Sequence, residues 1–87
     1  MSQIVFAEEA WAEYIFWQSQ DRKTVKRINQ LLASIEREGP MNGVGKPEKL
    51  KYQKGAYSRR IDDANRLVYS VSENQIVVKS CRGHYKD

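Results

Sequence analysis

Residues 21–39 read DRKTVKRINQLLASIEREG, and this run has the pattern of one long amphipathic helix. Asp21 is a favourable N-cap residue, so we predict that the helix begins at Arg22. Gly39 and Pro40 predict its end, because neither continues a helix well. Its buried side is marked by apolar residues at helical spacing, namely Val25, Ile28, Leu31, Leu32 and Ile35.

The segment before this helix predicts a strand followed by a second helix. Gln3–Phe6 is a short β-rich run, and Glu8 and Glu9 are acidic residues of the kind that favour a helix N-terminus. From Glu8 to about Gln20 an aromatic and apolar stripe recurs at helical spacing, namely Trp11, Tyr14, Ile15 and Trp17. We interpret this stripe as core, so the two helices form a hairpin.

The segment after the long helix predicts a loop and then a small sheet. Residues 39–55 are dense in glycine and proline, which indicates a long exposed connection. Residues 56–61, 66–71 and 76–81 alternate or run apolar and are separated by turn residues. We predict an antiparallel meander of three strands. No repeat or linker divides the chain, so we expect one domain over residues 1–87.

Composition narrows the class of protein. The chain of 87 residues has fifteen Lys and Arg against eleven Asp and Glu, a net charge of +4. This excess of positive charge is typical of a protein with a polyanionic partner, but a small soluble domain without such a partner can have it too. A single cysteine and no apolar leader favour a reducing cytoplasm, and no apolar run is long enough for a membrane span. One histidine and one cysteine leave no plausible metal set, so we expect no metal cofactor.

The second half of the chain contains residues of the types that catalyse RNA cleavage. That reaction needs a base for the 2′-hydroxyl, an acid for the departing 5′-oxygen, and cations over the phosphate. Glu48 and His84 can supply the base and the acid, and the cations can come from Lys51, Arg60 and Arg66. The alternative is that Glu48 lies in a solvated mixed-charge loop and His84 in an exposed tail.

The arginines of the meander depend on a register that the sequence does not fix. A three-residue loop would set Arg60 opposite Arg66, whereas a one-residue slip would turn one of them to the other face. One or both can instead form rim ion pairs with Asp62, Asp63 or Glu73. Arg59 should point away from Arg60, and for Arg59 we predict such a surface ion pair.

The end of the chain reads Cys81-Arg82-Gly83-His84-Tyr85-Lys86-Asp87 and follows an apolar strand. Histidine exchanges protons near neutral pH, and loop positions beside a rigid strand commonly carry catalytic groups. Tyr85 could stack on an RNA base. We interpret Cys81 as a small buried apolar residue.

Motifs along nearly the whole chain resemble the YoeB/Txe type of the RelE superfamily of bacterial toxins. Order, spacing and total length agree together, which is more specific than any single motif. The matching segments are Phe6-Ala7-Glu8-Glu9-Ala10-Trp11, Tyr14, Trp17-Gln18, Val25-Lys26-Arg27-Ile28-Asn29, Gly45-Lys46-Pro47-Glu48, Ser58-Arg59-Arg60-Ile61, Arg66-Leu67-Val68-Tyr69, Cys81-Arg82 and His84-Tyr85.

The resemblance implies an α+β fold of order β-α-α-β-β-β and a ribosome-dependent endoribonuclease that cuts mRNA in the decoding site. It implies Glu48 as general base, His84 as general acid and Arg66 as the main stabiliser of the phosphate. Further contacts to phosphate or RNA are implied for Arg60 and Lys51, and Tyr85 is similar to a terminal tyrosine that orients the substrate. The implied partners are the ribosome, mRNA, an antitoxin that blocks the site, and a second copy of the chain.

This chain departs from the family pattern at two places. Gly83 stands where relatives often have a bulky residue, so we expect a looser hold on His84. Lys86 and Asp87 follow the tyrosine at which relatives commonly end. Two rival functions remain open: a non-enzymatic inhibitor on the same scaffold, like the ParE toxins, and an RNA- or ribosome-binding module without cleavage.

Overall fold

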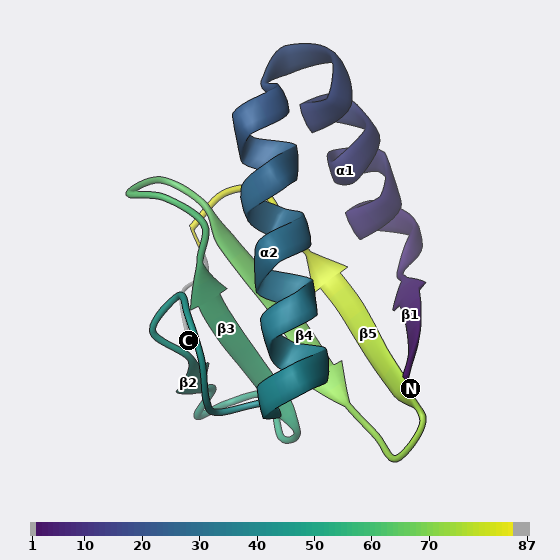
Figure 1. The fold of residues 1–87 in the computed structure, drawn as a ribbon, viewed down its shortest axis with the longest axis vertical. Coiled ribbons are helices and arrows are strands. Elements are labelled where there is room, and N and C mark those ends of the chain that lie inside the picture. Colours follow the sequence, from purple (N-terminus) through teal and green to yellow (C-terminus); the bar gives the residue numbers. More distant parts are fainter. Residues whose placement is uncertain (1, 85–87) are drawn as a thin grey trace.

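The computed structural model describes residues 2–84, in which two helices lie against one face of a sheet (Figure 1). The predicted α+β class and the predicted order of helices and strands are confirmed. One short strand, β2, lies inside the predicted loop and was not expected. In chain order the elements are β1 (Gln3–Phe6), α1 (Glu8–Gln20), α2 (Arg22–Glu38), β2 (Glu48–Lys49), β3 (Ala56–Arg60), β4 (Arg66–Val71) and β5 (Gln75–Ser80).

The strand order in the sheet is β1-β5-β4-β3-β2. Neighbours from β2 to β5 pair antiparallel, as predicted for the meander, whereas β1 pairs parallel with β5 and makes the sheet mixed. The path of the chain explains this direction (Figure 1). β1 and α1 run one way, α2 returns, and the longer strands β3, β4 and β5 then alternate in direction, so β5 runs alongside β1 in the same sense.

Helix α2 has the boundaries that its sequence predicts. The Asp21 carboxylate accepts hydrogen bonds from the backbone N–H groups of Lys23 and Thr24 in the first turn, and the Thr24 N–H also bonds to the Asp21 carbonyl. At the other end Gly39 adopts φ 91° and its N–H bonds to the carbonyl of Ile35. The cap at Gly39 fixes where the following loop begins.

The main core lies between the helices and the sheet. Its fully buried members include Ile28 and Leu31 of α2, Leu67 and Tyr69 of β4, and Val78 of β5. A smaller cluster comprises Leu50, Ala56 and Val68. Strand alternation puts Ala56 on the face of β3 opposite to Tyr57, which packs against the main core. The helix-free face of the sheet therefore has its own small apolar centre.

The aromatic stripe of α1 is only partly core, which corrects the prediction. Trp11 and Ile15 are 51% and 45% exposed, whereas Tyr14 and Trp17 pack against the main core. Ala10, Tyr14 and Trp17 follow the i, i+4, i+7 rule for one helix face, and this narrower row is the side that contacts the sheet. Trp11 and Ile15 lie beside that row, so periodicity alone placed them too deep.

Arg59 is fully buried, so the predicted surface ion pair for this residue is wrong. Its Nε donates to the Tyr69 hydroxyl at 2.9 Å, and Nη1 donates to Ser34 Oγ at 3.0 Å. The remaining bonds go to backbone carbonyls of the loop after α2, at Val44 (2.8 Å), Gly39 (2.9 Å) and Asn42 (2.5 Å). Arg59 points away from Arg60 as predicted, but α2 and this loop cover that face.

These five bonds use all five N–H groups of the guanidinium. Gly45 then brings the loop against β3, where its carbonyl accepts from the N–H of Arg60 at 2.7 Å. Gly45 has φ +91°, and a Cβ there would lie 2.6 Å from Leu31 Cδ2. Most residues of the predicted exposed connection are exposed, as expected, but its backbone is tied to the core through Arg59 and Gly45, and Leu50 is buried.

We expect Arg59→Leu to lower the free energy of unfolding by about 3 kcal/mol or more, because the buried carbonyls of the loop would lose their donors. The matched control is Arg60→Leu, which removes a half-exposed guanidinium at the next position and should cost about 1 kcal/mol or less. Urea unfolding followed by tryptophan fluorescence measures both. Equal losses for the two variants would contradict the assigned role of Arg59.

Candidate functional site

The sheet register places three of the predicted site residues on the helix-free face. Arg60 lies directly opposite Arg66 across β3 and β4, and Glu48 of β2 lies opposite Ser58. Residues directly opposite each other share a face, as do residues two apart on one strand. Glu48 and Arg60 are thus diagonal neighbours, a relation that brings Cα atoms to about 7–8 Å. The loop between Arg60 and Arg66 has five residues rather than the three considered, yet the two arginines are opposed.

The two arginines of this face differ in their surroundings. Arg60 is half-exposed and forms an ion pair with Asp63 in the loop that follows β3, as one of the alternative interpretations predicted. Because Asp63 is almost fully exposed, this pair is weak and an incoming phosphate can replace the carboxylate. Arg66 is half-buried, and no carboxylate within residues 2–84 pairs with it. Arg66 can thus bind a phosphate without first losing a carboxylate partner.

His84 is exposed and directly follows a segment that is bonded to the start of β4. The Gly83 N–H donates to Asn65 Oδ1 at 2.8 Å, and the Gly83 carbonyl accepts from the Arg66 N–H at 3.1 Å. Gly83 has φ 87°, a conformation that glycine adopts without strain. We expected Gly83 to hold His84 loosely. Its backbone is instead well anchored, because both its N–H and its carbonyl are hydrogen-bonded.

Helix α1 holds the same segment from the other side. The Cys81 N–H donates to Glu13 Oε1 at 2.7 Å, and the Cys81 carbonyl accepts from Trp17 Nε1 at 2.9 Å. The Arg82 guanidinium lies over the Phe16 ring, 3.7 Å from its centroid. Burial raises the pKa of the Glu13 carboxyl, and the two N–H bonds that it accepts oppose this shift. Residues 81–83 are thus anchored to both α1 and β4.

Glu48 and Lys51 line a second part of the site. They share a surface hollow of about 620 Å³ with Met41, Pro47, Lys49 and Tyr52. A carboxylate beside lysines in an open hollow suits a ribose hydroxyl next to a phosphate. The structure thus groups Glu48 with Lys51, and Arg60 with Arg66 and the segment before His84. The remaining predicted site residue, Tyr85, lies outside the described residues.

The anchoring residues were not found from the sequence. Asn65 was taken only as a turn residue, and Asp62 as a turn residue or an ion-pair partner of the arginines; their spacing is the one signal that could have indicated a structured loop. Glu13, Phe16 and Trp17 were taken as helix or core residues. Their contacts with residues 81–82 cross more than sixty positions, and no local pattern reports such contacts.

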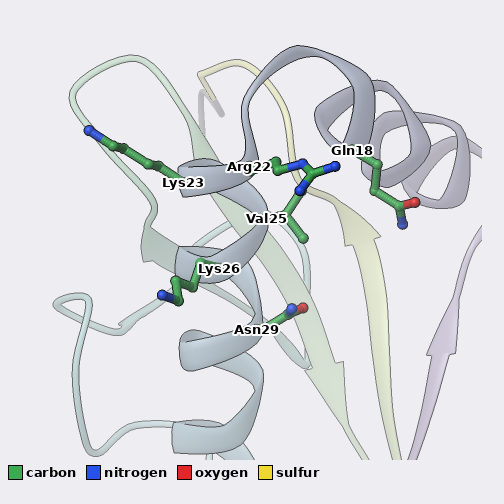
Figure 2. A pocket seen from close by; sticks show the side chains of 6 residues that line it. All are labelled: Gln18, Arg22, Lys23, Val25, Lys26 and Asn29. Carbon is green, nitrogen blue, oxygen red and sulfur yellow. The ribbon is translucent and has the colours of Figure 1, made fainter.

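A separate hollow of about 600 Å³ lies at the tops of the two helices (Figure 2). In this view Gln18, Arg22 and Asn29 turn toward the space between α1 and α2, whereas Lys23 and Lys26 point to the other side of α2. The lining residues are Gln18, Arg22, Lys23, Val25, Lys26 and Asn29. This surface adds cations to the helix layer, on the side of the molecule away from Glu48 and Arg66.

The described part of the chain, residues 2–84, has neither a metal-binding cluster of side chains nor a membrane-spanning helix. No group of three His, Cys, Asp or Glu side chains in this part of the chain is arranged to hold a metal ion. No helix in it has the length and apolarity needed to cross a membrane.

Known proteins resemble this chain over nearly its whole length. Residues 6–85 match the family described as the YoeB-like toxin of bacterial type II toxin-antitoxin systems. Toxin YoeB of Streptomyces coelicolor is 49% identical over 94% of this chain and 98% of its own length.

The chain belongs to the YoeB toxin family.

Two solved YoeB structures from Staphylococcus aureus share the fold. A YoeB dimer superposes with a TM-score of 0.93 at 48% identity, covering 97% of this chain and 98% of that one. A heterotetrameric YoeB-YefM toxin-antitoxin complex gives a TM-score of 0.91 at 49% identity, covering 98% and 99%. Family membership makes this chain a toxin of a type II toxin-antitoxin system, and the resemblance inferred from its motifs is confirmed.

The buried thiol of Cys81 should make the free energy of unfolding depend on pH. Burial, and secondarily the Glu13 carboxylate, raises the pKa of its thiol from 9.0 to about 12. Between these values the folded chain keeps a proton that the unfolded chain loses, so stability falls as pH rises through this interval. We expect the parent to lose about 1.4 kcal/mol more per pH unit than Cys81→Ala does above pH ~9. Urea unfolding across pH measures this difference, and parallel slopes would contradict it.

Proposed function

We propose that this toxin is a ribosome-dependent endoribonuclease that cleaves mRNA in the decoding site and so inhibits translation. In this proposal Glu48 is the general base, His84 the general acid and Arg66 the main stabiliser of the phosphate. Arg60 and Lys51 contact phosphate or RNA, and Tyr85 orients the substrate. One observation carries the proposal: Glu48, Arg60 and Arg66 share the open face of the sheet, and the peptide before His84 is bonded to Arg66.

The proposed reaction is a transesterification that needs no external reactant. Glu48 accepts the proton of a 2′-hydroxyl, and the oxygen attacks the adjacent phosphorus. Negative charge grows on the phosphate oxygens and is stabilised by the Arg66 guanidinium, with Arg60 contributing once Asp63 is displaced. His84 gives a proton to the departing 5′-oxygen. The products are a 2′,3′-cyclic phosphate and a 5′-hydroxyl, so bonds and protons balance.

The open geometry supports dependence on the ribosome. Glu48 lies on a two-residue strand at the edge of the sheet and is exposed, and His84 is exposed on the segment after β5. Neither residue lies in an enclosed pocket that could hold a flexible RNA. Because catalysis requires groups aligned to well within an ångström, a message fixed by the ribosome supplies the positioning that this face lacks.

The partners in this proposal are the ribosome, mRNA, a YefM-like antitoxin and a second copy of the chain. The relatives support the last two, since YoeB of Staphylococcus aureus is described both as a dimer and in complex with YefM. Exposed apolar residues on β1 and α1 provide surface that such protein contacts bury, namely Ile4, Val5, Trp11 and Ile15. We place the toxin in the cytoplasm as one domain, where translating ribosomes and a reduced Cys81 are both found.

Primer extension on mRNA in a reconstituted bacterial translation reaction tests the function. We expect new RNA ends only when ribosomes are present, and a loss of about 10²–10⁴ in cleavage rate for Glu48→Gln and for His84→Gln, because each removes one proton-transfer group. Glu73→Gln is the matched control, since it neutralises an exposed glutamate in the β4–β5 turn and should keep the parent rate.

Other outcomes would favour the rival functions. Growth arrest with intact mRNA, retained in the Glu48→Gln plus His84→Gln double variant, would indicate a ParE-like inhibitor. Salt-sensitive ribosome binding without new RNA ends would indicate a binding module. Rapid cleavage of naked RNA would contradict the proposed dependence on the ribosome.

A further inference from the structure

The Asn65 side chain is bonded at both of its polar ends. Its Oδ1 accepts the N–H of Gly83 at 2.8 Å, while its Nδ2 donates to the two Asp62 oxygens at 3.0 and 3.2 Å. Asn65 thus joins the β3–β4 loop to the peptide that precedes His84, across eighteen positions of sequence. None of these bonds belongs to the proposed catalytic groups themselves.

The β3–β4 loop is closed by hydrogen bonds that do not involve Gly83. Asp62 Oδ1 accepts the N–H groups of Ala64 and Asn65, both at 2.8 Å, and the Asn65 carbonyl accepts the N–H groups of Ile61 and Asp62. These bonds close the turn by themselves. The bond from Asn65 Oδ1 instead joins the loop to Gly83, and its removal leaves the turn closed.

Gly83 is held between two neighbours on the chain. Asn65 binds its N–H through a side chain, and Arg66 binds its carbonyl through the backbone. Upstream, Glu13 and Trp17 hold the peptide groups of Cys81. His84 is the first residue beyond these anchors, so its Cα is fixed relative to Arg66 even though its side chain is exposed.

We infer that Asn65 is a positioning residue, which sets the place of His84 relative to Arg66 through the Gly83 peptide. This inference rests on the proposed function, because it assigns a purpose to holding His84. Asparagine suits the position because one amide offers an acceptor to Gly83 and a donor to Asp62. Alanine would leave the Gly83 N–H to solvent, and aspartate alone would set a second carboxylate against Asp62.

The first test is Asn65→Ala in the full chain, read out in two ways. NMR order parameters of the Gly83 and His84 amides in the free protein should fall from near the rigid value of about 0.85 toward about 0.6. Ribosome-dependent cleavage should lose about tenfold or more in kcat with KM unchanged, because the message still binds while the acid is misplaced. Asn42→Ala is the matched control: it also removes one side-chain bond to backbone, to the Glu38 carbonyl, and does not touch residues 81–84.

An exchanged pair provides the rescue. Asp62→Asn combined with Asn65→Asp keeps the net charge, restores an acceptor for the Gly83 N–H and lets the new amide donate to the new carboxylate. We expect this double variant to recover the order parameters and most of kcat, whereas Asn65→Ala does not. A purely structural loss in Asn65→Ala would lower the amount of folded protein without changing kcat per active site.

The outcomes separate this inference from the function on which it rests. Unchanged order parameters in Asn65→Ala would overturn the anchoring, and a fall in order parameters with unchanged kcat would overturn the positioning role. Full cleavage by His84→Gln would overturn the proposed function instead, while the order parameters, measured without RNA or ribosomes, would still report whether Asn65 holds Gly83.

Discussion

A single buried guanidinium organises the part of the molecule from which the candidate site is built. Arg59 carries its charge among neutral oxygens and satisfies every donor with groups from α2, the following loop and β4. Burying a cation costs several kcal/mol unless its hydrogen bonds are complete, so the loop must keep one path for the charge to be tolerated. That path delivers the chain to β2, which carries Glu48.

On β3, the arginine that stabilises the fold and the arginine proposed to bind phosphate are consecutive residues. Arg59 faces the helices and is buried, whereas its neighbour Arg60 faces the open side and opposes Arg66. Because side chains alternate along a strand, the arginine that holds the loop fixes the direction of the arginine proposed to meet phosphate. On β4 the same division separates Arg66 from the buried Leu67.

Local signals predicted much of this fold, and tertiary contacts decided the rest. The Asp21 cap, the end of α2 at Gly39 and the meander depend on neighbouring residues, so sequence patterns were sufficient. Arg59 was misplaced because nearby acidic residues suggested a surface pair, while its real partners lie fifteen or more positions away or across the sheet. The kinds of residue in the candidate site follow from reaction chemistry. Their grouping required the register, and the Asn65 bond to Gly83 has no local signature.

The parallel pairing of β1 with β5 has a consequence for how the toxin is made. Gln3 pairs with Gln75, so the first strand has no partner in the sheet until the chain has been synthesised beyond residue 75. Contacts this distant in sequence also slow folding, because a long loop must close before they stabilise the chain. The segment that carries His84 emerges later still and needs both α1 and β4 in place. A nascent toxin therefore cannot assemble this surface before residues 75–84 have left the ribosome.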